Sequence, residues 1–275
     1  YFYSIKGETM KKKFIIILFM ILLLFYTLRG FIGNLKITYY QYYKNTLPED
    51  LNHFRIVQLS DFHLKEFGKQ QSKLISMIAQ CEPNLIVLTG DMINKDATHF
   101  EELKFLLEGI HKLAPIYAVT GNHEEESPYK NKLRNLYLEY DVMMLENTTK
   151  TITFGNATLY LHGFHYSWNL TKPKRIEKKA NEFHLLLFHD AQRIEVLSNF
   201  NYDMILCGHT HGGIVRLPFL GGIIGNHGDI LPKYDYGEYQ IGNTVSIVSS
   251  GLGNSNVPRF YNPPEIVCIE LNKTK

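Results

Sequence analysis

The sequence predicts an α/β protein preceded by one apolar helix near its amino terminus. Short runs rich in Ile, Leu and Val recur along the chain and alternate with segments of helical spacing, a pattern typical of buried strands in an α/β sheet. The chain has 275 residues, 45% of them hydrophobic and 13% aromatic, so it can bury a full core. The clearest expected strands are 54–59, 85–88, 116–119, 185–188 and 204–207.

Helices are predicted in the segments that separate these strands. The clearest has Leu74, Ile75 and Ile78 at helical spacing, and Pro83 ends it. The predicted helices are 69–81, 98–113, 128–140, 172–183 and 191–199. Further strands are expected near 142–145, 151–154, 157–161, 213–217, 244–249 and 265–271. Between the last few lies a glycine-rich loop, 218–243, which we interpret as a lid or a substrate wall.

The apolar segment 14–28 follows three lysines, Lys11, Lys12 and Lys13. Its length lies between that of a signal-peptide core and that of a full membrane helix. No small-x-small cleavage motif follows, so we expect a retained signal anchor; a cleaved signal and a buried core helix are the alternatives. Lysines before the segment and only Arg29 after it predict a single-pass protein of a bacterial cell membrane, with its catalytic domain on the extracytoplasmic side.

The chain is expected to divide into four parts. Residues 1–9 are interpreted as an over-extended reading of the gene, because Met10 opens the lysine cluster and codons for the residues before it can contain a bacterial ribosome-binding sequence. Residues 10–33 form the anchor, residues 34–53 a tyrosine-rich lead-in that begins with a short strand, and residues 54–271 the catalytic domain.

Charge and cysteine content exclude several classes of protein. The formal net charge is +2, and no long basic stripe of the kind found on nucleic-acid binders is present, so no nucleic-acid partner is expected. A basic run at 172–179 fits either a solvated helix face or contact with an anionic membrane. The three cysteines, odd in number, fit neither a zinc cluster nor a disulfide framework.

Five short motifs, each after an apolar run, carry the chemistry of the chain. Each alone is weak evidence, since Gly-Asp and Asn-His pairs also occur in ordinary turns. Together they deliver acids, imidazoles and one amide to the carboxyl ends of successive strands, where ligands collect in open α/β sheets. The motifs are Asp61-Phe62-His63, Gly90-Asp91, Gly121-Asn122-His123-Glu124, His189-Asp190 and Gly208-His209-Thr210-His211.

The residue types indicate a site for two divalent cations. Imidazole and carboxylate without thiolate suit Mn, Fe, Zn or Co. A carboxylate can bridge two ions, and Asp91 is the central candidate. Two ions about 3.5–4 Å apart can share a hydroxide and hold both oxygens of an in-line displacement at phosphorus.

This motif set resembles that of the calcineurin-like metallophosphoesterases. The later motifs His209-Thr210-His211-Gly212-Gly213, Ser250-Gly251-Leu252-Gly253 and Asn262-Pro263-Pro264-Glu265 resemble the YkuE/YaeI-like branch of membrane-anchored or exported phosphodiesterases. The resemblance covers residues 50–271 and implies a four-layer α-β-β-α sandwich with the site at the strand ends.

The resemblance also implies roles for particular residues. His123 is expected to face the phosphoryl group and help protonate the leaving oxygen, and Arg259 and Asn122 are candidates for binding phosphate oxygens. His165 and His227 lie in loops that can reach the cleft. One implied metal is held by Asp61, His63, Asp91 and His211, and the other by Asp91, Asn122, His189 and His209.

One position departs from the family pattern. Many relatives carry aspartate three residues after the Gly-Asp aspartate, where it orients the catalytic histidine, and this chain has Asn94 there. An amide cannot stabilise an imidazolium electrostatically. We therefore expect either that Glu124 or Asp96 compensates or that the pH optimum moves.

The sequence as a whole predicts a membrane-anchored, divalent-metal-dependent phosphoesterase. It would hydrolyse a phosphodiester, a pyrophosphate or a phosphomonoester through a metal-bound hydroxide, with a lipid-linked substrate favoured by the anchor. The alternatives are an enzyme similar to UDP-2,3-diacylglucosamine pyrophosphatases, a nuclease of the same fold, and a non-catalytic metal-bound module that docks a partner at the membrane. No obligate protein partner is predicted.

Overall fold

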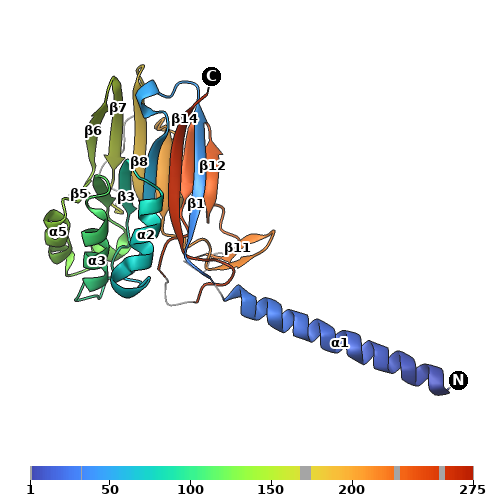
Figure 1. The fold of residues 1–275 in the computed structure, drawn as a ribbon. Helices are drawn as coiled ribbons and strands as arrows, with labels where there is room; N and C mark the ends of the chain where they lie inside the picture. The colour runs from blue at the N-terminus through green and yellow to red at the C-terminus, as the bar shows by residue number, and fades with distance from the viewer. Residues whose placement is uncertain (1, 32, 168–174, 226–229, 254–257, 275) are drawn as a thin grey trace.

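Two six-stranded sheets that face each other form the body of the protein (Figure 1). The computed structural model describes residues 2–31, 33–167, 175–225, 230–253 and 258–274. The first sheet has the order β1-β14-β2-β3-β4-β5, the second has the order β12-β13-β9-β8-β7-β6, and β10 and β11 form a separate hairpin. The strands are β1 Lys36–Lys44, β2 Phe54–Leu59, β3 Leu85–Thr89, β4 Ile116–Val119, β5 Met143–Met144, β6 Thr148–Phe154, β7 Ala157–Gly163, β8 Glu182–Asp190, β9 Met204–Gly208, β10 Val215–Leu217, β11 Gly221–Ile224, β12 Gly237–Ile241, β13 Thr244–Val248 and β14 Glu265–Lys273.

The main core lies between the two sheets. Ile56 and Val87 of the first sheet and Leu187 and Leu206 of the second belong to one buried cluster. The central strands β2, β3 and β4 pair in parallel, as do β7, β8, β9 and β13. Strands β3, β4 and β9 are buried along their whole length, because each sheet is covered on both sides there. Burying each large apolar side chain contributes about 1.5–3 kcal/mol.

Helices cover the outer faces of both sheets and complete four layers. Leu74 of α2, Leu106 of α3 and Tyr137 of α5 pack over the first sheet, and Ile194 and Leu197 of α6 pack over the second. The four-layer sandwich is therefore confirmed, with a thin fourth layer. These elements are η2 Lys69–Gln71, α2 Ser72–Gln80, α3 Glu101–Ile110, α4 Asn122–Glu126, α5 Lys130–Glu139, η4 Ala191–Arg193 and α6 Ile194–Ser198, with η1 Glu49–Leu51 before β2.

The helix predicted over 172–183 is wrong. Residues 172–174 lie outside the described residues, residues 175–179 have no regular structure, and β8 begins at Glu182. The backbone N–H of Ile176 donates to the carbonyl of Phe200 at 3.0 Å, and the Asn201 side chain donates to the Ile176 carbonyl. These tertiary hydrogen bonds, made with a neighbouring loop, take the place of the helical ones.

The loop expected over 218–243 contains two strands. β11 pairs with β10 as an antiparallel hairpin, and β12 pairs with β13 at the edge of the second sheet. The prediction of a structureless loop is therefore wrong over these residues. Both strands are short and have glycine at their first residue, so neither has the long apolar run by which the other strands were recognised.

The first and last strands of the domain lie next to each other. β1, within the tyrosine-rich lead-in, pairs in parallel with β14 over nine residues, from Lys36 opposite Glu265 to Lys44 opposite Lys273. The lead-in therefore supplies the edge strand of the first sheet.

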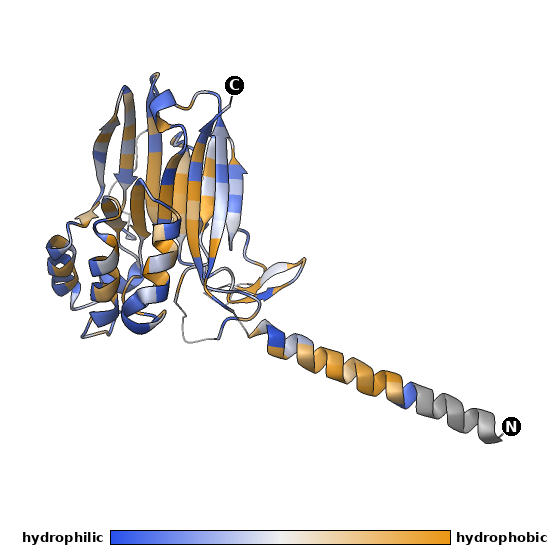
Figure 2. Cartoon of the chain, viewed as in Figure 1, coloured by the Kyte–Doolittle hydropathy of each residue, from blue (hydrophilic) through white to orange (hydrophobic). Residues whose placement is uncertain are grey.

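A long helix, α1 Phe2–Gly30, projects from the body (Figure 1). Its segment Lys12–Gly30 is apolar around the helix and only 6% buried, as the hydropathy colouring in Figure 2 shows. At 1.5 Å per residue this segment is about 28 Å long, close to the ~30 Å hydrocarbon core of a bilayer. Its length and composition fit a membrane anchor or a signal sequence.

A partly buried histidine pair predicts acid sensitivity of the fold. Nε2 of His162 lies 3.1 Å from Nδ1 of His184. Burial, with His184 adding to it, lowers the pKa of His162 to about 4. Between pH 4 and 6.5 the unfolded chain therefore binds a proton that the folded chain rejects, so stability falls as the pH falls, by up to ~3 kcal/mol from this residue.

We expect the substitution His162→Gln to flatten the pH dependence of the free energy of unfolding between pH 6.5 and 4. The measurement is denaturant unfolding of the full chain in detergent with a chelator present. The control is His99→Gln, because His99 is exposed. Equal slopes for the wild type and His162→Gln would contradict the expectation.

Candidate metal centre

The five predicted motifs meet at one edge of the sandwich. They follow β2, β3 and β4 in the first sheet and lie at the ends of β8 and β9 in the second. Since these strands run in parallel within each sheet, their carboxyl ends open onto one side. The side chains brought together there are those of Asp61, His63, Asp91, His123, His189, His209 and His211, and Asn122 directly precedes His123 in the chain.

Asp91 lies at the centre of the group. One of its carboxylate oxygens, Oδ2, is 3.2 Å from Nε2 of His189 and 3.9 Å from Nε2 of His63. The same oxygen is 4.0 Å from Nε2 of His123. A single oxygen of Asp91 thus reaches imidazoles from both sheets.

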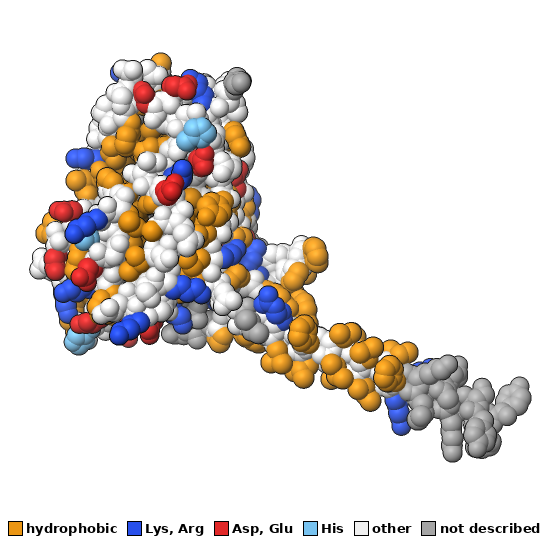
Figure 3. Space-filling view, in the orientation of Figure 1, with side chains coloured by type: hydrophobic (Ala, Val, Ile, Leu, Met, Phe, Trp, Pro, Cys, Tyr) orange, Lys and Arg blue, Asp and Glu red, His pale blue; other side chains and the backbone are white. Residues whose placement is uncertain are grey.

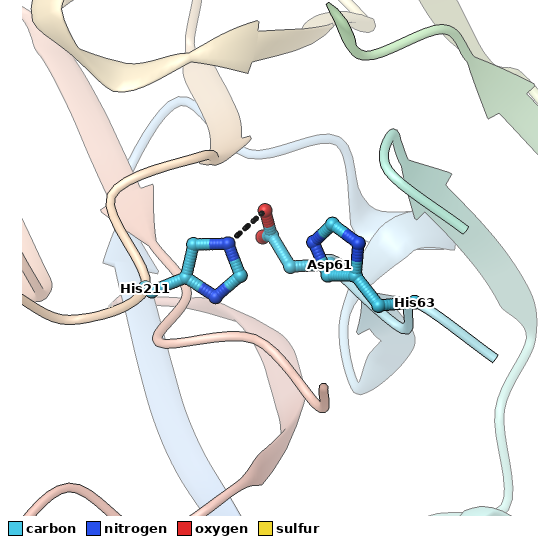
Figure 4. Close-up of side chains that lie close together, drawn as sticks. All are labelled: Asp61, His63 and His211. Atoms are coloured by element: carbon cyan, nitrogen blue, oxygen red, sulfur yellow. Dashed lines mark ion pairs between the residues drawn. The ribbon is translucent and has the colours of Figure 1, made fainter. Parts of the chain in front are cut away.

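The ligand-type atoms fall into two main groups. Asp61, His63 and His211 form one, and Figure 4 shows Nε2 of His211 directed at Oδ1 of Asp61, 3.6 Å away. Asp91, His189 and His209 form the other. Within each group, ligand atoms lie within 4.8 Å of one another. A third group, His63, Asp91 and His123, shares His63 with the first and Asp91 with the second, so the groups adjoin, as neighbouring sites for two cations would.

The backbone turns sharply at the residues of this centre. Five of them have φ between 48° and 72°, the left-handed region that non-glycine residues rarely occupy. Such conformations cost on the order of 1 kcal/mol each and are concentrated at functional sites. They let the chain reverse directly after a strand, so that the side chain points back over the sheet edge. The five are Asp61, His63, Asp91, His209 and His211.

Hydrogen bonds at Nδ1 of His189 and of His63 fix which nitrogen of each ring faces the centre. Nδ1 of His189 donates to the carbonyl of Thr89 at 2.7 Å, which leaves Nε2 toward Asp91. Nδ1 of His63 lies 3.0 Å from Oδ1 of Asn94, an acceptor, which leaves Nε2 of His63 inward. Asn94 therefore orients His63, and this role was missed in the sequence.

Three buried atoms of the motif residues have unused bonding capacity. Nε2 of His63, Nδ1 of His211 and Oδ1 of Asn122 have no hydrogen-bond partner within the part of the chain that the structure describes. Buried polar atoms are nearly always satisfied, so each such atom needs an explanation. Nitrogen and oxygen lone pairs, with carboxylates and imidazoles nearby and no thiolate, suit divalent cations such as Mn, Fe or Zn. The residues present therefore fit a metal centre.

The charges of the centre are strongly coupled. Burial alone would raise the pKa of Asp91, but His189, with His63 and His123, outweighs it and holds the pKa below its usual range. Burial alone would lower the pKa of His189, but Asp91 outweighs it and raises the pKa to about 10. Protons and cations therefore compete for the same atoms, as at metal sites generally.

Glu124 stabilises the two turns that carry Asp91 and Asn122. Its buried carboxylate accepts the backbone N–H groups of Asp91, Met92, Ile93 and Gly121 at 2.6–3.2 Å. Burial, with Asp91 adding to it, raises the pKa of Glu124 to about 7 against these donors. The carboxylate thus ties the turn after β3 to the turn after β4.

From the sequence we expected Glu124 or Asp96 to replace the missing aspartate as the partner of His123. Among the described residues, neither carboxylate is hydrogen-bonded to the His123 ring. Nδ1 of His123 instead accepts the backbone N–H of Lys95 at 3.2 Å, and the N–H of His123 donates to Asp91. A backbone amide therefore orients His123.

The remaining candidates lie around the centre. Nε of Arg259 donates to the Gly253 carbonyl at 2.9 Å; burial lowers the pKa of Arg259 to about 10, and Asp61 opposes that shift. His165 lies 2.7 Å from Glu125, outside both metal groups. His227 lies outside the described residues. The ring of Tyr166 is 5.5 Å from that of His209, so it borders the centre.

The fold is an α/β sandwich, and residues from both of its sheets form a candidate metal centre at the strand ends. Residues 54–213 match the family model described as calcineurin-like phosphoesterase, and the chain belongs to that family. It is therefore a hydrolase acting on phosphoester bonds, in a family that uses two metal ions.

Several known proteins are similar to this chain. The uncharacterized metallophosphoesterase YkuE of Bacillus subtilis (strain 168) is 29% identical over 83% of this chain and 82% of its own length. Phosphodiesterase YaeI of Escherichia coli (strain K12) is 29% identical over 79% of this chain and 82% of its own length. The solved structure of TT1561 from Thermus thermophilus has a TM-score of 0.47 and 12% identity, over 73% of this chain and 90% of that one.

We expect Glu124→Ala to destabilise the protein by at least ~3 kcal/mol, because each buried N–H left unpaired costs about 1–3 kcal/mol. The bound metal content should fall as well, because the Asp91 turn loses its support. Thermal unfolding and elemental analysis of the full chain in detergent measure both effects. Glu126→Ala is the control, since the Glu126 side chain is 56% exposed. A variant Glu124→Ala with unchanged stability and metal content would disprove this role.

Proposed function

We propose that the protein is a membrane-anchored phosphodiesterase that works with two divalent cations. One cation would be held by Asp61, His63, Asp91 and His211. The other would be held by Asp91, Asn122, His189 and His209. The observation that carries the proposal is the meeting of these side chains around Asp91, with buried lone pairs on His63 and Asn122 that lack hydrogen-bond partners among the described residues.

The assignment of Asn122 to the second cation is supported by its surroundings. Asn122 begins α4, directly after β4, and its neighbour Gly121 approaches Asp91 so closely that a methyl group there would collide with the carboxylate. Glycine is therefore required at position 121. Asn122 lies between Gly121 and His123, and the N–H of His123 donates to Oδ1 of Asp91, so we propose that the Asn122 amide serves a cation or, as the sequence also suggested, a phosphate oxygen.

His123 is proposed to donate a hydrogen bond to the leaving oxygen. Because Nδ1 accepts the Lys95 N–H, the neutral ring carries its proton on Nε2, the atom that faces the centre. When bound, the two cations would acidify a water molecule and neutralise charge on the phosphoryl group. Water adds to phosphorus, and the bond to the leaving oxygen breaks. The proton that the water loses ends on the leaving oxygen, and the Nε2–H of His123 stabilises the negative charge that develops there.

Support for a diester substrate comes from the relative YaeI, which is named a phosphodiesterase. Arg259 is the proposed contact for a non-bridging phosphate oxygen, since its guanidinium lies close enough to Asp61 for the two charges to interact. A nuclease is disfavoured, because the net charge of +2 is near balance and nucleic-acid binders rely on many cationic contacts.

Retention of α1 as an anchor is the second part of the proposal. The segment Lys12–Gly30 has the length and hydropathy for one membrane crossing, and its side chains are exposed. Lysines 11–13 precede the apolar segment and Arg29 ends it, which favours a cytoplasmic amino end and an outward-facing domain. The substrate would then be a phosphodiester at the membrane surface, such as a lipid-linked headgroup.

We expect the full chain with Mn²⁺ to hydrolyse bis(p-nitrophenyl) phosphate. His209→Ala should abolish turnover and lower the metal content, because it removes a proposed ligand. His123→Gln should keep the metal content but lower kcat about 100-fold or more, because it removes the imidazole hydrogen bond that stabilises the leaving oxygen. Elemental analysis and steady-state kinetics measure the two effects separately.

The matched control is again His99→Gln, whose exposed ring lies outside the metal groups. It should retain full turnover. Wild-type turnover in His209→Ala, or a loss of metal in His123→Gln, would refute the division of roles between the metal ligands and the hydrogen-bond donor His123.

We also expect the expressed chain to remain in the membrane fraction after high-salt and carbonate washes, because a spanning helix is not an electrostatic attachment. Intact mass measured on that fraction checks whether α1 is retained. A mass beginning after residue 30 in a released, soluble protein would establish the cleaved-signal alternative instead.

A further inference from the structure

Four large apolar side chains are exposed beside the place where α1 leaves the body. Phe219 is fully exposed and Leu220 is 67% exposed, and both lie in the turn of the β10–β11 hairpin. Ile230 and Leu231 are also exposed, and the N–H of Leu231 donates to the Ile223 carbonyl of β11 at 3.0 Å. We call Phe219, Leu220, Ile230 and Leu231 the apolar tip. Figure 3 shows apolar atoms on this projection.

The base of the hairpin is joined to the end of α1 through one residue, Phe260. The N–H of Arg216 in β10 donates to the Phe260 carbonyl at 2.9 Å. The ring of Phe260 in turn lies 5.0 Å from that of Phe31 and against Gly30. Figure 1 shows the hairpin projecting beside the carboxyl end of α1, where the helix joins the body.

A second link joins the end of α1 to the chain beside the metal centre. The N–H of Tyr261 donates to the Gly30 carbonyl at 2.7 Å, and its hydroxyl donates to the Tyr26 carbonyl at 2.7 Å. The next residue, Asn262, donates through Nδ2 to the carbonyl of His211. Anchor, hairpin and metal centre are therefore held to one short segment of chain.

A recess of about 240 Å³ lies at this junction. Two basic residues, Lys65 and Arg259, are in its wall together with Gly30 and Phe31 from the end of the anchor. Lys65 follows His63 by two residues, and Arg259 interacts electrostatically with Asp61. The recess thus connects the helix end with the edge of the metal centre and has the charge to attract an anionic headgroup.

We propose that the apolar tip inserts into the headgroup region of the bilayer that α1 spans. Attachment to the membrane through the helix alone leaves the domain free to tilt. Attachment through both α1 and the apolar tip fixes the orientation of the domain on the membrane surface. The recess between them then faces the lipid headgroups, and phosphodiester headgroups of membrane lipids are the substrates delivered to the metal centre. This inference rests on the proposed anchor and deepens the proposed activity.

A bilayer is favoured over a protein as the binding partner of the apolar tip, because the tip continues the exposed apolar surface of α1. The side chains from Phe14 to Phe25 on α1 are exposed around the helix, and Phe31 extends that surface to Phe260 at the base of the hairpin. Aromatic and basic residues at this level, such as Tyr26 and Arg29, are typical of the membrane–water interface.

The first test measures depth in the membrane. The full chain with Trp168→Phe and Phe219→Trp is placed in vesicles of phosphatidylcholine and phosphatidylglycerol, with and without brominated acyl chains. We expect emission at shorter wavelength and strong quenching by the brominated lipid. The control is Leu138→Trp in the same background, because Leu138 is 74% exposed on α5, away from α1. Equal, weak quenching at both positions would overturn the proposal.

The second test measures delivery of substrate. The double variant Phe219→Ser/Leu220→Ser should hydrolyse a lipid-anchored p-nitrophenyl phosphodiester in vesicles about tenfold more slowly or worse. Its turnover of the water-soluble aryl phosphodiester should equal that of the wild type, which shows an intact metal centre. Unchanged hydrolysis of the lipid-anchored compound would overturn the proposal.

The two tests separate failure of this inference from failure of the proposed function. Quenching at position 219 requires no catalysis, so it decides membrane contact even for an inactive protein. Quenching of the Phe219→Trp variant, together with a wild type that hydrolyses neither compound, would refute the phosphodiesterase proposal alone. Hydrolysis of the soluble compound by the wild type, without quenching of the Phe219→Trp variant, would refute the membrane contact alone.

Discussion

The metal centre depends on how the two sheets are fixed to each other at one edge. Its ligand-type residues come from both sheets, so any sliding of one sheet over the other would separate them. Gln58 of β2 prevents this, because its buried Nε2 donates to the Cys207 carbonyl of β9 at 2.8 Å and to the Thr89 hydroxyl at 2.9 Å. His189 adds a second link from β8 to the Thr89 carbonyl. These polar links give the apolar core between the sheets a definite register, which non-directional burial cannot do.

The sheet edge also has to hold its turns in conformations that the chain disfavours. Left-handed backbone at five site residues costs several kcal/mol in sum, on the order of 1 kcal/mol each. Hydrogen bonds made only in the folded state offset this cost. The Glu124 carboxylate accepts four backbone N–H groups, and the Asp61 carboxylate accepts the N–H of His209 at 3.1 Å. Bound cations would stabilise the same turns further, since a ligand that binds only the folded state adds to its stability.

Features that depend on local pattern could be predicted from the sequence. The buried strands β2, β3, β4, β8 and β9 are continuous apolar runs, and the residues after them meet at one edge for a general topological reason. The short strands β11 and β12 were missed, because their formation depends on a partner strand rather than on their own composition. The helix expected around Ile176 failed for a similar reason, since a distant loop supplies its hydrogen-bond partners. The role of Glu124 was equally out of reach, because four backbone N–H groups from two turns meet it only in the folded chain.

The amide at position 94 shows how a centre of this kind can redistribute its supporting contacts. A carboxylate beside an imidazole both orients the ring and stabilises its protonated form, and the two effects are inseparable in that residue. In this chain Asn94 orients His63 instead, and the backbone N–H of Lys95 orients His123. Position 94 can therefore hold an amide, because the orientation of His123 in this structure depends on a backbone N–H and not on a carboxylate at position 94.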